Sequence, residues 1–170
     1  VLPVLNEEKY IKRCVDSLLA QTFPLEILVL DGGSTDSTLE LLQNYGDSIR
    51  VIHNPGKHVA NARNLAMQHL DGDITHCFEI IGHSWVEPDH LEKRVQDLLD
   101  LEETLGRKVG AIGCLTESAG SESHISAWIE GALRTPIGSG GGQFKKFVGR
   151  HQTKVPAFCL HNVEALRSVD

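Results

Sequence analysis

No apolar run in this sequence approaches the ~20 residues that a membrane-spanning helix needs. A basic segment followed by an apolar stretch, which marks a secretory signal, is also missing. Basic residues are in the minority, with 16 Lys and Arg against 23 Asp and Glu. Phosphate backbones are bound by clustered positive charge, so we expect no nucleic-acid partner. A local basic pocket for a small phosphate ligand is still compatible with this composition.

The four cysteines include no C-x-x-C pair. Cys14, Cys77, Cys114 and Cys159 are far apart, and each stands in an apolar stretch. A chain of 170 residues is long enough to bury a hydrophobic core without the support of disulfides. We therefore expect reduced core thiols in a cytoplasmic protein.

The sequence also lacks an initiator Met. It begins at Val1 inside an apolar stretch and stops at Asp170 in the middle of a pattern. We therefore expect a fragment of a longer protein, truncated at both ends.

Short strand and helix patterns alternate along most of the chain, and they predict an α/β fold. Strict alternation favours a Rossmann-like, mostly parallel sheet with helices on both faces. Ligands bind such sheets at the carboxyl ends of the strands, so the loops that follow strands are the candidate sites. Strands are expected at 1–5, 25–30, 49–53, 74–81, 109–114 and 155–160, and helices at 8–20, near 39–42, 58–70, 89–105, 124–133 and 162–168.

Three segments in or beside these loops carry candidate chemistry, and each also has a purely structural interpretation. Asn6 followed by two glutamates is typical of a helix N-cap. Asp31 with the glycines after it is equally compatible with an ordinary turn. Arg63, taken alone, is compatible with a solvated side chain on a helix.

The order and spacing of these segments resemble the family 2 glycosyltransferases, which have the GT-A fold. The resemblance rests on P-V-L-N-E-E at 3–8, Q-T-F-P-x-E-I-L-V-L-D-G-G-S-T-D-S-T at 21–38, A-N-A-R-N at 60–64 and G-H-S-W-V-E-P-D at 82–89. The segment P-I-G-S-G-G-G-Q-F at 136–144 is similar to the bacterial exopolysaccharide branch, which includes succinoglycan-type glucosyltransferases. The resemblance implies one GT-A domain over 1–170, with a nucleotide-binding half at 1–115 and the start of an acceptor-side half at 116–170.

The resemblance implies nucleotide contacts for Pro3, Leu5, Glu7, Asp31, Gly32 and Arg63. Pro3, Leu5 and Glu7 fall where the family lines the base and the ribose. Asp31 and Gly32 stand where the family has two adjacent acids, so one acid is missing and the identity of the base stays open. Arg63 matches an arginine that faces the nucleotide, where a guanidinium suits phosphate or carbonyl oxygens.

The metal motif departs most from the family pattern. Counting back from the proline at 88, the Asp-x-Asp positions fall on Ile81, Gly82 and His83. His83 fits the Asp-x-His variant of the exopolysaccharide branch, whereas Ile81 has no atom that can coordinate a metal. Hard Mg²⁺ prefers oxygen ligands and imidazole suits Mn²⁺ better. The resemblance thus implies a divalent cation, Mn²⁺ or Mg²⁺, at His83, and the alternative is that His83 merely caps the strand.

Two nearby carboxylates are candidates for further ligands of the predicted cation. On a regular strand the Cα atom of Glu79 would lie roughly 13 Å from that of His83, too far for both to bind one ion. Glu87 is nearer if its loop curls back.

Trp85 and Trp128 each suit either sugar stacking or a place in the core. The glycine run 138–142, with basic residues after it, suits either a phosphate-facing lid or a solvated loop.

By resemblance, the protein transfers a sugar from a nucleoside-diphosphate donor, with a UDP-sugar expected, to a glycan or lipid-linked acceptor with inversion. Such an acceptor implies work at the inner face of the cell membrane. The catalytic base is expected beyond Asp170, so the fragment alone is expected to be inactive. A non-catalytic sugar-nucleotide-binding or scaffold protein is the alternative, because of Ile81 and Gly32. A dinucleotide-dependent oxidoreductase is disfavoured, because no G-x-G-x-x-G follows the first strand.

Overall fold

The computed structural model describes residues 1–114, 124–133, 135, 152 and 158–168. The chain divides into two compact units. The first comprises Val1–Ala111 and Leu160–Asp170, and the second comprises Ile112–Cys159. The residues predicted to contact the nucleotide, together with His83, all belong to the first unit. Whether the chain is one domain with halves at 1–115 and 116–170 stays a prediction.

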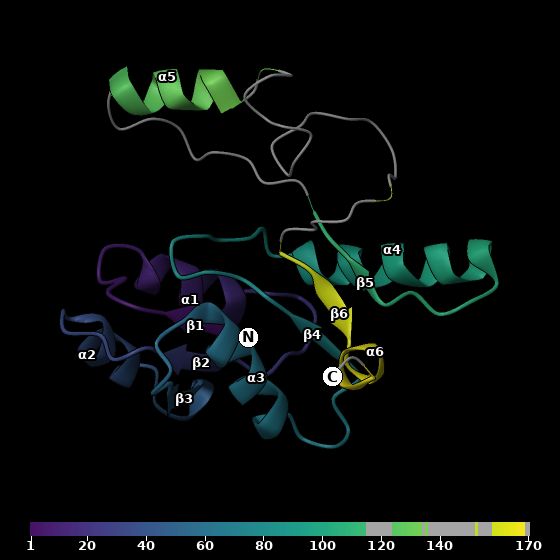
Figure 1. The fold of residues 1–170 in the computed structure, drawn as a ribbon, viewed down its shortest axis with the longest axis horizontal. Coiled ribbons are helices and arrows are strands. Elements are labelled where there is room, and N and C mark those ends of the chain that lie inside the picture. Colours follow the sequence, from purple (N-terminus) through teal and green to yellow (C-terminus); the bar gives the residue numbers. More distant parts are fainter. Residues whose placement is uncertain (115–123, 134, 136–151, 153–157, 169–170) are drawn as a thin grey trace. The chain divides into compact units, whose positions relative to one another are not determined.

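Three parallel strands form the first sheet, in the order β1 (Leu2–Val4), β2 (Leu28–Asp31) and β3 (Arg50–His53) (Figure 1). All residues of β1 and β2 are buried, as the continuous apolar run over β2 predicts. The helices after β1 and β2 are α1 (Ile11–Leu19) and α2 (Thr38–Gln43), and they contact each other. Right-handed crossovers place both on the same face of the sheet.

The helix α3 (Val59–His69) follows β3 and packs against β1 and β2. Leu28 and Leu30, two residues apart on β2, point to the same face and meet Ala62 and Ala66 of α3. All four side chains are buried. The two alanines lie four residues apart on one side of α3, so the helix can approach the sheet closely. Arg63 on this helix pairs with Glu79, which stands between Phe78 and Ile80, two residues whose backbones hydrogen-bond to Val1.

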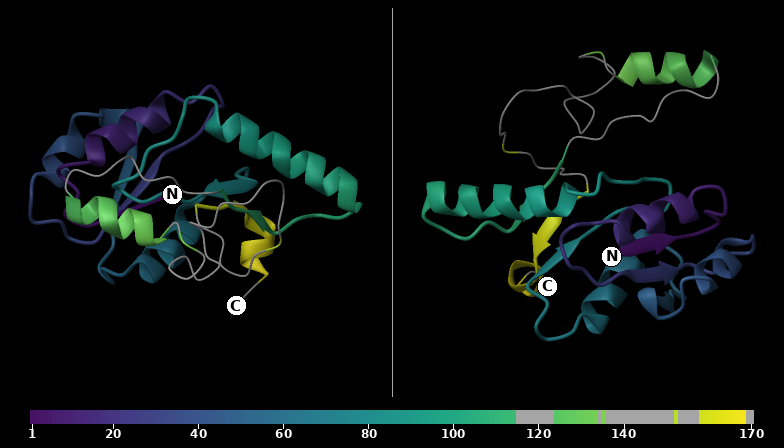
Figure 2. Two further views of the ribbon diagram at one scale, coloured as in Figure 1. Left: turned by 90° about the horizontal axis from the view of Figure 1, so that it is seen from above. Right: turned by 180° about the vertical axis from the view of Figure 1, so that it is seen from behind.

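A second, smaller sheet has the strand order β4 (His76–Phe78), β6 (Leu160–Asn162) and β5 (Ala111–Ile112). β6 pairs with β4 in the antiparallel direction, with Cys77 opposite His161. The strand pairs of the first sheet are parallel and the β4–β6 pair is antiparallel, so the prediction of a mostly parallel α/β fold is confirmed. The helices beside this sheet are α4 (His90–Leu105), which runs along it in both views of Figure 2, and α6 (Val163–Arg167).

Several strands are shorter than predicted. In place of the expected strand at 74–81, the structure has β4 at His76–Phe78, and a turn closes further on, where the Ser84 N–H donates to the Ile81 carbonyl. Glu79 and His83 therefore do not lie on one regular strand, and Glu79 pairs with Arg63 whereas His83 contacts Glu7. Residues 155–157 of the expected strand at 155–160 lie outside the described residues, and the strand found there, β6, begins at Leu160. The expected helix at 124–133 is α5 (His124–Leu133).

The cysteines are reduced, as predicted. Burial, together with the nearby Glu7 carboxylate, raises the pKa of the Cys14 thiol to about 12. Within the described part of the chain, no helix has the length and hydropathy to cross a bilayer.

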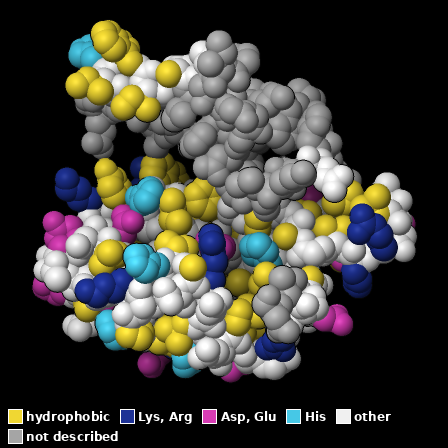
Figure 3. Space-filling view, viewed as in Figure 1, with side chains coloured by type: hydrophobic (Ala, Val, Ile, Leu, Met, Phe, Trp, Pro, Cys, Tyr) yellow, Lys and Arg dark blue, Asp and Glu magenta, His cyan; other side chains and the backbone are white. Residues whose placement is uncertain are grey.

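Figure 3 shows hydrophobic side chains gathered on α5, where Ile125, Trp128 and Ile129 are exposed. Trp128 is 80% exposed, so it does not have the burial of a core residue.

Two neighbouring leucines test the packing of α4. Leu98 is 2% exposed and Leu99 is 51% exposed. We expect Leu98→Ala to lower the free energy of unfolding by about 2–5 kcal/mol, because it leaves a cavity. Leu99→Ala, the matched control, is expected to change it by about 0.5 kcal/mol or less. Urea unfolding of both variants measures the difference, and equal losses would contradict this packing of α4.

Candidate active site

The loops that follow β1 and β2 interlock at the carboxyl edge of the first sheet. The Asn6 N–H donates to Ser34 Oγ over 2.9 Å, and the Thr35 N–H donates back to Asn6 Oδ1 over 2.8 Å. Asn6 has a φ of 56°, a left-handed conformation that asparagine tolerates. One residue on, the Glu7 N–H donates to Thr38 Oγ1. These reciprocal bonds fix one loop against the other.

A buried carboxylate shapes the loop after β2. The side chain of Asp31 is 2% exposed and accepts from the Gly33 N–H, from the Ser34 N–H and from Ser34 Oγ, the last over 2.6 Å. The same Ser34 Oγ accepts from Asn6, so Asp31 is linked to the loop after β1. That Asp31 also contacts a nucleotide stays a prediction, and its carboxylate is already engaged within its own turn.

The missing second acid at position 32 has a steric explanation. Gly32 is buried, and its N–H donates to the Val4 carbonyl. A Cβ placed on Gly32 would lie 3.1 Å from the carbonyl oxygen of Lys57, closer than ordinary van der Waals contact. Lys57 itself has a φ of 60° in the turn after β3. An acid at 32 would therefore require that turn to move.

Glu7 and His83 are brought together from distant parts of the sequence. His83 Nδ1 lies 2.9 Å from Glu7 Oε1. The His83 side chain is 54% exposed, whereas Glu7 is 17% exposed. Gly82 leaves room for this contact, because a Cβ there would lie 2.6 Å from Glu7 Cγ. The Tyr10 ring meets the His83 ring edge to face, with 6.5 Å between centroids. The carboxylate beside His83 is thus Glu7, which sequence reasoning had assigned to base and ribose contacts.

Arg63 is held by a bidentate ion pair. Its Nε and one terminal nitrogen donate to the two carboxylate oxygens of Glu79, over 2.9 and 2.7 Å. The Glu79 side chain is 15% exposed and that of Arg63 is 57% exposed. Both of these charges affect the pKa of His161 on β6. Burial lowers its pKa, and Glu79 and Arg63 then act on it in opposite directions. Glu79 is therefore the carboxylate that orients Arg63, a role that the sequence reading missed.

The other predicted residues have simpler surroundings. Pro3 is buried within β1, and Leu5, just after β1, is 45% exposed. The Arg13 guanidinium lies 3.3 Å from the centre of the Trp85 ring, so one face of that ring already carries a cation. The glycine run 138–142 and the basic residues after it, expected as a lid or a solvated loop, lie outside the described residues.

The described protein side chains near His83 are too few to hold a divalent cation alone, and they fit one only when a bound diphosphate supplies further ligands. Among the described residues, no group of three or more His, Cys, Asp or Glu side chains could hold an ion. Ile81 offers no donor atom. His83 does have the arrangement typical of a metal-ligating imidazole, with one ring nitrogen on a carboxylate. Diphosphate oxygens would have to supply the remaining ligands.

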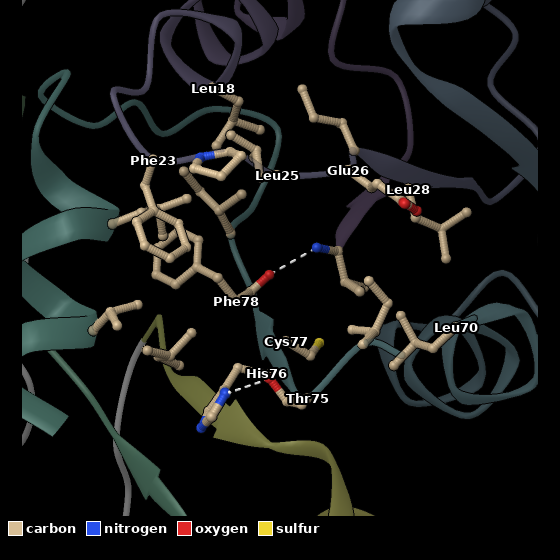
Figure 4. A pocket seen from close by; sticks show the side chains of 18 of the residues that line it. Leu18, Phe23, Leu25, Glu26, Leu28, Leu70, Thr75, His76, Cys77 and Phe78 are labelled. Carbon is tan, nitrogen blue, oxygen red and sulfur yellow. Dashed lines mark hydrogen bonds between the residues drawn. The ribbon is translucent and has the colours of Figure 1, made fainter. Parts of the chain in front are cut away.

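An apolar pocket lies away from these loops, near the amino ends of the strands. Its volume is about 380 Å³. Figure 4 shows Leu18, Phe23, Leu25 and Phe78 among its lining side chains. It also reaches the first residues of β2 and β4. The pocket contains none of the predicted site residues, and parallel sheets bind ligands at the opposite end of their strands.

A sequence model of Glycosyl transferase family 2 matches residues 1–165. The match covers nearly the whole chain, so the chain belongs to this family. One relative is the dolichyl N-acetyl-alpha-D-glucosaminyl phosphate 3-beta-D-2,3-diacetamido-2,3-dideoxy-beta-D-glucuronosyltransferase of Methanococcus voltae. It is 28% identical over 153 residues, which are 85% of this chain and 46% of that protein.

Solved structures confirm the α/β GT-A fold. TarS of S. aureus matches with a TM-score of 0.66 at 19% identity, over 98% of this chain and 47% of that chain. A second TarS structure, which holds UDP-GlcNAc, matches with a TM-score of 0.54 at 22% identity, over 72% of this chain and 35% of that chain.

The mannosyltransferase of Pyrobaculum calidifontis, which holds GDP-Man and Mn²⁺, matches with a TM-score of 0.56 at 25% identity. The match covers 68% of this chain and 34% of that chain. The chain thus spans less than half the length of the relative and the structures compared.

The buried carboxylate of Asp31 gives a direct test of how the loops are built. In Asp31→Asn, one acceptor oxygen is replaced by an amide nitrogen that faces N–H and O–H donors. We expect the free energy of unfolding to fall by about 1–3 kcal/mol, because buried donors lose their acceptor. Asp47→Asn, at an exposed position on the 3-10 turn Gly46–Ser48, is the matched control and should change little. Thermal unfolding of both variants measures the effect, and equal stability would show that Asp31 does not hold the loop.

Proposed function

We propose that this chain binds a nucleoside-diphosphate sugar at the interlocked loops after β1 and β2 and transfers the sugar to an acceptor hydroxyl. Membership of the family supports the reaction class. The observation that carries the proposal is the Glu7–His83 contact beside the interlocked loops at the carboxyl edge of the sheet. That edge is where open α/β sheets bind their ligands.

The proposed donor is a UDP-sugar. Pro3, Leu5, Asp31 and Gly32 would line the base and the ribose, and Arg63 would face the phosphates or a carbonyl oxygen. TarS holds UDP-GlcNAc, whereas the Pyrobaculum mannosyltransferase holds GDP-Man. The glycine at position 32 removes the acid that most affects the choice of base, so the two nucleotides must be compared directly.

The proposed reaction is a single displacement that inverts the anomeric centre. An acceptor hydroxyl attacks the anomeric carbon, a general base takes its proton, and the nucleoside diphosphate leaves. No residue of this chain is assigned as the base. A divalent cation, Mn²⁺ or Mg²⁺, would offset the charge of the leaving diphosphate. His83 would be its protein ligand, beside diphosphate oxygens.

The acceptor is proposed to be a growing glycan or a lipid-linked sugar, as in the bacterial exopolysaccharide branch. The Methanococcus relative is named for a dolichyl-phosphate-linked acceptor, which supports this choice. Action on such an acceptor would take place at the cytoplasmic face of a membrane. The alternative, a non-catalytic sugar-nucleotide-binding protein, is favoured by one observation, that Ile81 has no donor atom where the family motif has an acid.

Nucleotide binding tests the first part of the proposal. We expect UDP to bind more tightly than GDP in isothermal titration calorimetry. Arg63→Ala should weaken UDP binding roughly 10- to 100-fold, because a charge-assisted hydrogen bond is worth about 1.5–3 kcal/mol. Arg107→Ala, at an exposed position after α4, is the matched control. Equal affinities of the Arg63 variant and the parent chain would contradict the assignment of Arg63.

Metal dependence separates the two candidate functions. We expect Mn²⁺ to tighten UDP binding to the parent chain, and we expect His83→Ala to abolish that gain while leaving metal-free binding largely unchanged. His69→Ala serves as the matched control, because His69 is an exposed histidine at the end of α3 and is not part of the metal motif. Binding that does not respond to Mn²⁺ would favour the non-catalytic protein.

A further inference from the structure

We infer that Glu7 is a positioning residue for His83. Its carboxylate engages Nδ1 of the imidazole and leaves Nε2 as the ring nitrogen for a divalent cation shared with the donor diphosphate. The inference rests on the proposed function, because the cation is bound only together with a nucleotide. It changes the assignment of Glu7, which the sequence places against the base and the ribose.

The contact fixes the tautomer of His83. An ionised carboxylate has only acceptor atoms, so the 2.9 Å contact with Glu7 Oε1 requires a hydrogen on Nδ1. In the neutral ring, Nε2 then carries the lone pair. A cation can bind that nitrogen without breaking the bond to Glu7. The opposite tautomer would present the lone pair of Nδ1 to a carboxylate and would repel it.

Glu7 is itself held in place from both ends. Its N–H donates over 2.8 Å to Oγ1 of Thr38, which is fully buried. Its side chain crosses Gly82 so closely that a Cβ at 82 would lie 2.6 Å from Glu7 Cγ and 3.0 Å from Cδ. The Tyr10 ring borders the imidazole from another side. The position of the imidazole is therefore set by the same hydrogen bonds between the loops after β1 and β2 that shape the proposed nucleotide site.

The chemistry of the motif explains why such a partner matters here. Ile81 supplies no carboxylate, so His83 is the one protein donor that the motif offers. A carboxylate on the far nitrogen of an imidazole raises the basicity of the ligating nitrogen and fixes its orientation. Glu7 thus contributes negative charge to the site through the ring, where an acid at 81 would have contributed it directly.

The first experiment measures the tautomer in the free chain. With ¹⁵N-labelled histidine, NMR distinguishes protonated from unprotonated Nδ1, and the spectrum of His83→Gln identifies the His83 signals among the nine histidines. We expect the Nδ1–H tautomer in the parent chain and a clear fall in its share in Glu7→Ala. Gly82→Ala should have the same effect, because its methyl group displaces the Glu7 side chain and removes no polar group.

The second experiment measures Mn²⁺ affinity in the presence of UDP by electron paramagnetic resonance of the free ion. Glu7→Ala should weaken Mn²⁺ binding by about 10- to 100-fold, the usual cost of losing such a carboxylate. Glu7→Gln should lose less affinity than Glu7→Ala, because its amide oxygen still accepts from Nδ1–H although it carries no negative charge. Glu40→Ala removes an exposed carboxylate from α2 and is the charge control.

Several results would overturn the inference. An unchanged tautomer in Glu7→Ala would show that Glu7 does not set the ring. Equal Mn²⁺ losses in Glu7→Gln and Glu7→Ala, with the tautomer kept in Glu7→Gln, would make Glu7 a metal ligand instead. UDP binding without any Mn²⁺ effect in the parent chain would leave Nε2 with no cation. A chain that binds no UDP under any condition would instead contradict the proposed function, and the tautomer measurement would still decide what Glu7 does.

Discussion

The buried carboxylate of Asp31 is the interaction on which the site depends. It ends a fully buried strand and would be costly there without partners, so the chain supplies donors from its own turn. The Ser34 hydroxyl, which is bonded to Asp31, also accepts from the Asn6 N–H, and the Thr38 hydroxyl accepts from the Glu7 N–H. One acid at a strand end therefore fixes two loops, and those loops carry the residues proposed to hold the donor.

Much of the fold follows from local patterns. The continuous apolar run before Asp31 predicts a buried parallel strand, and the alanine pair of α3 predicts close packing on the sheet. The antiparallel direction of β6 was not predictable, because it depends on a return of the chain from residue 112 to residue 160. Strand periodicity says nothing about direction over so long a separation.

The positions of the site residues could be predicted from the sequence, but their side-chain partners could not. The positions of Glu7, His83 and Arg63 follow from motif spacing, but their partners come from residues 76 and 16 positions away. Regular strand geometry placed Glu79 on the face of His83, whereas β4 ends at Phe78 and Glu79 pairs with Arg63. One signal was present in the sequence: Gly82, between two motif positions, marks a place where another side chain crosses the backbone.

The direction of β6 has a consequence for how this kind of protein diversifies. The chain leaves the second sheet at β5 and re-enters it at β6, in the order β4, β6, β5. An excursion whose ends are pinned to one sheet can lengthen, shorten or be exchanged at little entropic cost to the rest of the molecule. A change in the length of the segment 113–159 would therefore leave the strand ends after β1 and β2 in place.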